Sequence, residues 1–162
     1  MKLYHGSDKI VDKPIIMEAN RPLDFGYGFY LTTSYEQARK LALRVSIRNK
    51  TNNSYVNSYD FNLEEASKSL KIIKFDGPTK EWLLFVCNNR QLIDNNLEYD
   101  VVIGPVADDN VYSVITRYEN GIYDLDETLK RLKVEVLKNQ ILFHTNKSLK
   151  YLSFEGVDEA YE

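Results

Sequence analysis

Three short segments of the chain place polar and aromatic side chains at the expected end of a β-strand, and the first two also contain glycine. They are segment 4–7, segment 25–32, which contains Gly28 and Tyr30, and segment 140–143, which begins with Gln140. Because glycine has no side chain, the backbone at such points can approach a flat ligand closely. The three segments are therefore the candidate ligand-binding parts of the chain.

Each segment taken alone has a simpler explanation. A single histidine after a strand, such as His5, is more often a surface or structural residue than a ligand-binding group. The pair Gly26 and Gly28 lacks the third glycine and the βαβ context of a dinucleotide-binding fingerprint, so by itself it predicts only a turn. The 12 tyrosines of the chain suit a ligand cleft and a wet sheet surface equally.

Hydrophobic periodicity predicts the elements that must position these segments. We expect a strand at 3–5 that ends in a turn at 6–7, and a second strand at 29–32. A helix is expected from a capping box at Ser34 to near Arg48. The other expected elements are strands at 55–61, 70–75, 99–106, 140–144 and 153–157, and helices at 79–89, 108–118, 124–133 and 145–152. This mixture without βαβ regularity predicts an α+β fold.

The bulk properties fit one domain spanning 1–162, with 43% hydrophobic and 28% charged residues. A net charge of −3 with scattered Lys and Arg offers no basic face, which makes nucleic acid a less favoured partner. The chain has no stretch of 18 apolar residues and no apolar leader, so we expect a cytoplasmic protein without a membrane partner. Its single cysteine, Cys87, lies in an apolar helical pattern and is expected to be buried and structural.

Several other polar residues have both a structural and a functional interpretation. Asp100, Asp108 and Asp109 flank an apolar strand and could bind a target or a metal, but such acids more often cap helices. No group of residues has the spacing of metal ligands, so we expect no metal site. Arg21 could bind a pyrophosphate in bidentate fashion or remain a solvated surface residue. The Thr32 hydroxyl could support the cleft from its strand.

Taken together and in order, the three segments resemble the motifs of the ADP-ribosyltransferase superfamily, in the branch of diphtheria toxin and the poly(ADP-ribose) polymerases. Segments 4–7, 25–32 and 139–143 are similar to the first, second and third motif of that branch. The start of the chain and segment 24–30 also resemble a bacterial group catalogued as domain of unknown function 3990. The resemblance implies a split β-sheet core with flanking helices and a cleft that binds NAD as a substrate.

The resemblance also implies roles for individual residues. His5 would hold the adenosine ribose, the Gly6 backbone would bond the nicotinamide carboxamide, and the Tyr30 ring would stack on the nicotinamide. Gln140 occupies the position of the catalytic glutamate of the family, and Leu41 occupies that of a second aromatic wall. His5, Tyr30 and Gln140 are thus the expected catalytic residues. The expected NAD site is completed by Ser7, Gly28, Thr32 and Arg21.

Three functions are compatible with these residues. The first is an NAD-dependent mono-ADP-ribosyltransferase that modifies a macromolecule, a protein rather than a nucleic acid, as a bacterial toxin or effector. For a toxin, the resemblance implies a small antitoxin as a further partner. The second is a binding module that keeps the fold but has lost catalysis through Gln140 and Leu41. The third is an NAD glycohydrolase, which uses water as the acceptor.

Overall fold

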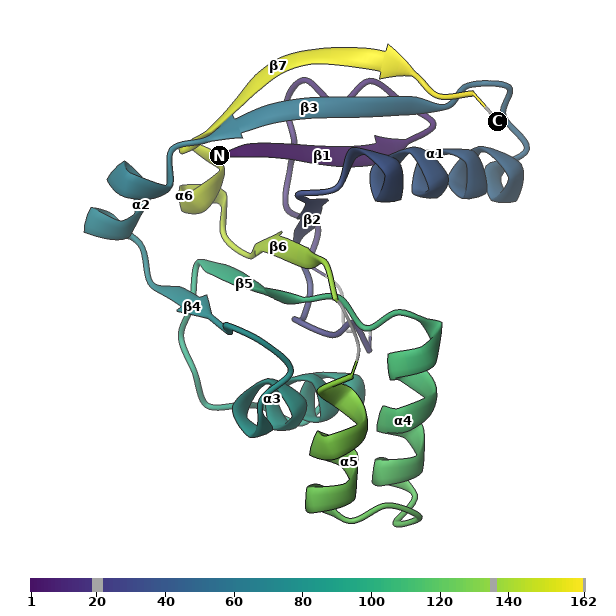
Figure 1. Ribbon diagram of the computed structural model, residues 1–162. Coiled ribbons are helices and arrows are strands. Elements are labelled where there is room, and N and C mark those ends of the chain that lie inside the picture. The colour runs from purple at the N-terminus through teal and green to yellow at the C-terminus, as the bar shows by residue number, and fades with distance from the viewer. Residues whose placement is uncertain (19–21, 135–136, 162) are drawn as a thin grey trace.

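The computed structural model describes residues 1–18, 22–134 and 137–161 of the chain (Figure 1). Its strands are β1 (Lys2–Ser7), β2 (Phe29–Thr32), β3 (Tyr55–Phe61), β4 (Ile72–Lys74), β5 (Val101–Pro105), β6 (Asn139–Phe143) and β7 (Leu152–Glu159). Its helices are α1 (Tyr35–Asn49), α2 (Leu63–Ser69), α3 (Lys80–Arg90), α4 (Asp109–Glu119), α5 (Leu125–Leu132) and α6 (Asn146–Leu149). This mixed order of helices and strands confirms the predicted α+β class.

The strands form one seven-stranded sheet in the order β4-β5-β6-β2-β1-β3-β7. Neighbouring strands are antiparallel, except that β4 and β5 are parallel. β1 pairs with β3 along its whole length, whereas a single register pair, Tyr4 with Thr32, joins β1 to β2. The β1–β2 junction is therefore the narrowest connection in the sheet. It separates β1, β3 and β7 from the other four strands (Figure 1).

Two local predictions need correction. The expected turn at Gly6 and Ser7 is absent, because β1 continues through both residues and pairs both of them with β3. Helix α2 was not predicted, since its seven residues are too few to display a helical period. Its start is marked instead by Asn62, whose side chain accepts a hydrogen bond from the Glu65 backbone N–H.

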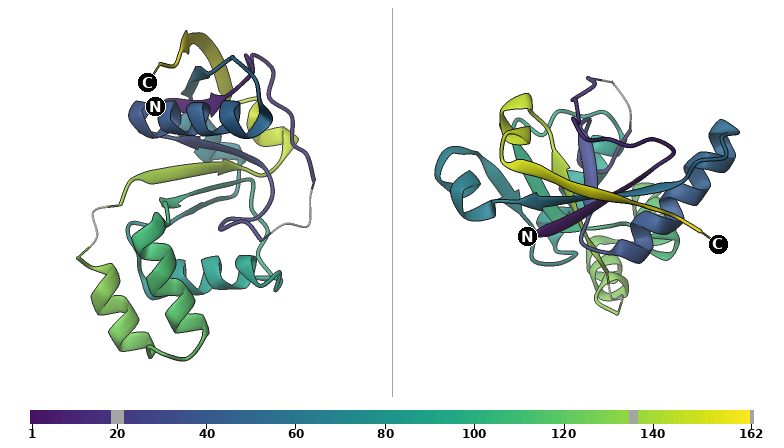
Figure 2. Two further views of the ribbon diagram at one scale, coloured as in Figure 1. Left: turned by 90° about the vertical axis from the view of Figure 1, so that its right-hand side faces the viewer. Right: turned by 90° about the horizontal axis from the view of Figure 1, so that it is seen from above.

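The two faces of the sheet carry separate apolar clusters, because successive residues of a strand point in opposite directions. On β2, Phe29 and Leu31 belong to one cluster, whereas Tyr30 packs against the other. The second cluster is built with residues of α3, α4 and α5 around the fully buried Trp82. Figure 2 shows these three helices grouped at one end of the molecule and α1 lying along β1.

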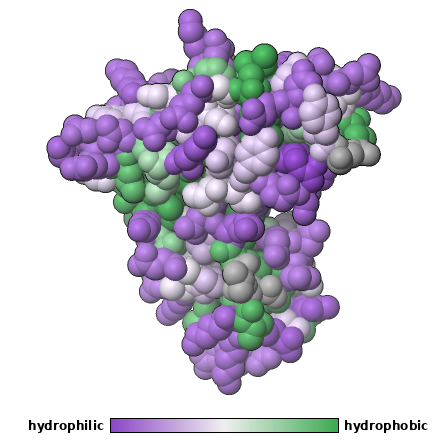
Figure 3. Space-filling model, turned by 45° about the horizontal axis from the view of Figure 1, so that its top comes forward, coloured by the Kyte–Doolittle hydropathy of each residue, from purple (hydrophilic) through white to green (hydrophobic). Residues whose placement is uncertain are grey.

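The longest helix in the part of the chain that is described, α1, has 15 residues. None of the helices there is long and apolar enough to cross a bilayer. The face drawn in Figure 3 is largely hydrophilic, and its apolar residues are confined to small patches.

Gly6 sets the distance between β1 and α1. A Cβ atom on this glycine would lie 2.0 Å from the Ala38 carbonyl oxygen and 2.7 Å from the Ala42 nitrogen. Both neighbours are backbone atoms of a helix and cannot move aside as the end of a side chain could. Both alanines are also buried, so the helix rests directly on the strand. The helix and strand can pack this closely only because residue 6 has no side chain.

The close packing at Gly6 leads to a testable expectation. The substitution Gly6→Ala should lower the free energy of unfolding by about 3 kcal/mol, because α1 must move away from β1. Gly77→Ala is the matched control, since a Cβ there meets nothing within 4 Å. The control should change stability by less than about 0.5 kcal/mol in urea denaturation. Equal effects of the two substitutions would contradict the close approach at Gly6.

Candidate functional site

A cavity of about 120 Å³ lies at the narrow junction between β1 and β2. Its walls come from these two strands, from α1, from Val106 after the end of β5, and from the start of β6. Tyr4 and Thr32, the only register pair of the junction, both line it. The cavity therefore lies where the two parts of the sheet are least connected.

This cavity brings together most of the site residues predicted from the sequence. The predicted residues that line it are His5, Gly6, Tyr30, Thr32, Leu41 and Gln140. Ser7 and Gly28 do not line it. Gly28 has φ 148° and passes close to β6, where a Cβ would meet the Phe143 carbonyl oxygen at 2.3 Å. Arg21 falls outside the described residues.

The strand register and the helix period explain how distant residues meet at the cavity. Thr32 of β2 is directly opposite Gln140 of β6, and residues in opposite positions of an antiparallel pair share a face. Gln37 and Leu41 lie one turn apart on α1, so they present one side of the helix to the cavity. The site thus combines one strand pair with one face of a helix.

Two amide side chains give the cavity its polar character. The Thr32 hydroxyl donates to Gln37 Oε1 at 2.6 Å and accepts from the Ser34 backbone N–H at 3.0 Å. These bonds orient the Gln37 amide and leave its Nε2 without a hydrogen-bond partner among the described residues. Gln140 Nε2 is buried and likewise has no partner there. A buried donor without a partner costs roughly 1–3 kcal/mol, so Gln140 Nε2 in particular favours a ligand that accepts hydrogen bonds.

Tyr30 joins the cavity to the loop that precedes β2. Its hydroxyl accepts from the Phe25 N–H at 3.1 Å and donates to the Gly26 carbonyl at 2.5 Å. Burial is the main reason why the pKa of this phenol is raised well above its ordinary value, so Tyr30 stays neutral. The hydroxyl therefore fixes the loop, and the ring and backbone are the parts of Tyr30 that remain for a ligand.

The His5 ring lies on the other face of the sheet from the Tyr30 ring. It packs on Phe29 with the ring centroids 4.5 Å apart, and Phe29 and Tyr30 point to opposite faces of β2. Its Nδ1 lies 2.9 Å from the Tyr30 carbonyl oxygen, which can only accept, so Nδ1 carries the proton. The hydrogen bond from the His5 ring thus links β1 to β2, a role that the family resemblance does not imply.

Two polar residues of the cavity were not identified as site residues from the sequence. Gln37 was interpreted only as part of a helix cap, and Arg44 was not singled out. Both lie within one turn of Leu41, so the helical spacing of 37, 41 and 44 was the signal that could have identified them. Arg44 is exposed, and among the described residues no carboxylate lies within ion-pair distance of it. It is a free cation at the cavity that suits a phosphate group.

The remaining polar candidates have structural partners. Asp108 caps α4, as expected, by accepting from the Val111 N–H. Asp100 is not a helix cap: it is buried and accepts from the Thr145 hydroxyl and the Lys71 N–H. Cys87 is buried, as expected. In the described ranges of the chain, no three of the His, Cys, Asp and Glu residues lie close enough to hold a metal ion.

The position of His5 predicts a pH dependence of stability. Burial lowers the pKa of His5 below its ordinary value of 6.5, and the hydrogen bond to the Tyr30 carbonyl opposes this only in part. The unfolded chain therefore binds a proton at a higher pH than the folded chain does. The stability contributed by neutral His5 is complete above pH 6.5 and is lost as the pH falls from there toward the folded pKa.

We therefore expect His5→Gln to reduce the loss of unfolding free energy that accompanies acidification below about pH 6.5. The NMR signals of the His5 ring in the wild type should titrate below that value. A His5 ring that titrates above 6.5 would contradict the buried, carbonyl-bonded placement.

The comparison with known proteins adds the family of the chain. Residues 1–154 match a family described as "Protein of unknown function (DUF3990)". No curated protein and no solved structure matches the chain. The family match covers all seven strands except the end of β7, and with them the whole cavity at the β1–β2 junction. By this match, the chain belongs to the DUF3990 family.

Proposed function

We propose that the protein is an NAD-dependent mono-ADP-ribosyltransferase of the diphtheria toxin and poly(ADP-ribose) polymerase type, with a protein as the acceptor. One observation supports this proposal above all others. Gly6, Tyr30 and Gln140, which come from the three segments that resemble the superfamily motifs, line one cavity between two strands. A resemblance in three separate segments has little weight unless the fold brings them together.

The lining of the cavity suits the nicotinamide end of NAD. The Tyr30 ring offers a flat apolar surface for the nicotinamide. The unpartnered Nε2 groups of Gln37 and Gln140 are hydrogen-bond donors for the carboxamide oxygen or for ribose hydroxyls. Arg44, which lines the same cavity, would bond the diphosphate, the role that the sequence analysis considered for Arg21.

The chemistry of transfer depends on the charge near the ribose. Breaking the bond between nicotinamide and ribose passes through an oxocarbenium-like state, as in glycoside hydrolysis. A carboxylate about 4 Å from this cation would attract it by about 4 kcal/mol at an effective dielectric constant near 20. Gln140 offers only a hydrogen bond to the ribose 2′-hydroxyl. A slow transferase is therefore expected.

A binding module is the second candidate, and Gln140 is the observation that favours it. The amide lacks the charge of the catalytic glutamate, and Leu41 offers no aromatic ring to the nicotinamide. NAD binding without nicotinamide release would support the binding module. Release of free ADP-ribose alone would support an NAD glycohydrolase.

The test of the proposal is to incubate the purified chain with labelled NAD and a protein extract. Free nicotinamide is then measured, and ADP-ribose on protein is identified by mass spectrometry. If Gln140 orients the 2′-hydroxyl, Gln140→Ala should reduce nicotinamide release roughly ten- to a hundredfold, the loss of one hydrogen bond. Gln140→Glu should keep or raise NAD hydrolysis, because it adds the missing charge.

Asn139→Asp is the matched control for the glutamate substitution. It adds the same charge one residue earlier on β6, at an exposed position that does not line the cavity. This control should leave nicotinamide release unchanged. Wild-type activity in Gln140→Ala would remove Gln140 from the site. An inert wild type together with an active Gln140→Glu variant would favour the binding module.

A further inference from the structure

A second cavity of about 300 Å³ adjoins the first one. Gln37 and Val106 line both cavities, so the two spaces share a wall at the start of α1 and the end of β5. The second cavity extends from there toward Asp108, Leu137 and Lys138. It is larger than the first and has no residue of the three superfamily-like segments in its lining. Its function is therefore a separate question from the binding of nicotinamide.

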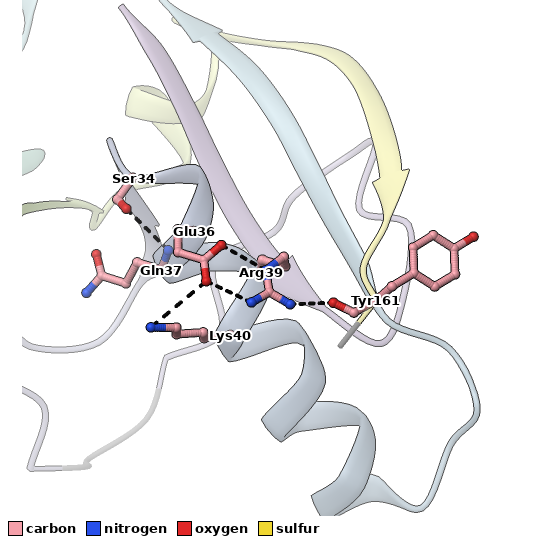
Figure 4. Close-up of polar contacts among 6 residues, drawn as sticks. All are labelled: Ser34, Glu36, Gln37, Arg39, Lys40 and Tyr161. Carbon is pink, nitrogen blue, oxygen red and sulfur yellow. Dashed lines mark hydrogen bonds and ion pairs between the residues drawn. The ribbon is translucent and has the colours of Figure 1, made fainter.

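Two carboxylates of the described residues line these cavities, and one of them is already neutralised. Glu36 accepts two hydrogen bonds from the Arg39 guanidinium, at 2.7 and 2.8 Å, and Lys40 Nζ lies 3.9 Å from it (Figure 4). The bonds from Arg39 lower the pKa of Glu36. Figure 4 also shows that the Gln37 side chain points away from this ion pair. Glu36 is thus committed to Arg39 and poorly suited to accept a proton.

Asp108 is the other carboxylate, and only one of its two oxygens has a hydrogen-bond partner among the described residues. Its Oδ1 accepts from the Val111 N–H at 2.9 Å as the N-cap of α4. Its Oδ2 has no hydrogen-bond or ion-pair partner among the described residues. The cap fixes the orientation of the carboxyl group while leaving one basic oxygen at the second cavity. An exposed capping Asp would ordinarily be only structural, but this one is beside the proposed transfer site.

The proposed transfer reaction needs a carboxylate that can accept a proton from the acceptor. An acceptor hydroxyl that attacks the ribose must lose its proton, and the amide of Gln140 cannot take it at neutral pH. The carboxylate that performs this task must lie on the acceptor side of the sugar. Among the described residues that line either cavity, Asp108 is the one carboxylate with a free oxygen.

We propose that the second cavity is the acceptor site and that Asp108 is its general base, an inference that rests on the proposed transferase function. Oδ2 takes the proton of a hydroxyl acceptor as the acceptor oxygen forms its bond to C1′ of the ribose. The bond between C1′ and the nicotinamide nitrogen breaks, and its electron pair stays on nicotinamide, which leaves as a neutral molecule. The proton then passes from Asp108 to water. When no acceptor is present, water takes the same place.

The substitution Asp108→Asn tests this role without removing the cap, because Asn caps helices as well as Asp does. We expect the melting temperature and the affinity for NAD to be unchanged and nicotinamide release to fall at least about a hundredfold, as on loss of a general base. Asp124→Asn is the matched control. Asp124 caps α5 by accepting from the Glu127 N–H at 2.8 Å and lines neither cavity, so this variant should keep full turnover.

Added azide separates a catalytic role of Asp108 from a structural one. Azide is an anionic nucleophile that carries no proton, so it needs no base and should restore nicotinamide release in Asp108→Asn, with ADP-ribosyl azide as the product. Full turnover in Asp108→Asn without azide, or no recovery with it, would overturn the assignment and leave the proposed function standing. A wild type that releases no nicotinamide, even with protein extract present, would contradict the proposed function itself.

Discussion

The direct contact between α1 and β1 at Gly6 is the constraint on which the site depends. It holds Gln37, Leu41 and Arg44 against the sheet at the point where β1 and β2 share one register pair. A side chain at residue 6 would force the helix away from the strand, and the cavity would lose its wall. The same glycine that the superfamily resemblance assigns to nicotinamide binding is therefore required for the fold itself. Its structural role and its proposed role in nicotinamide binding are compatible, because a close backbone approach serves both.

The two neighbouring cavities differ in their charged groups, and this difference assigns each a separate part of the proposed reaction. The first is lined by neutral amides and a phenol held in its neutral form, with a cation at Arg44. The second contains the free carboxylate oxygen of Asp108. In this arrangement the sugar cation receives hydrogen bonds rather than a full negative charge, and the charge needed for proton transfer lies on the acceptor side. The proposal therefore implies that the bond between nicotinamide and ribose breaks slowly, and that the rate of nicotinamide release depends on the acceptor.

Local patterns predicted the α+β class, the start of α1 at Ser34 and the buried Cys87, because caps and apolar periods are encoded within a few residues. They did not predict contacts made by the tertiary fold. Gln37 was expected to complete a capping box, but its side chain bonds Thr32 and faces the cavity. His5 lines the cavity, and its role at a ligand stays a prediction; local patterns did not indicate that its ring would pack on Phe29 and bond the Tyr30 carbonyl. Asp100 pairs with Thr145, 45 residues away, and no local signal reports such a contact.

The most direct test of the central claim, that NAD binds at the β1–β2 junction, is an NMR titration of the ¹⁵N-labelled protein with NAD. The account predicts shifts of the Gly6 and Thr32 backbone amides and of the Gln37 and Gln140 side-chain amides, with little change at residues around His144 at the far end of β6. Shifts centred elsewhere, or none at saturating NAD, would contradict the account.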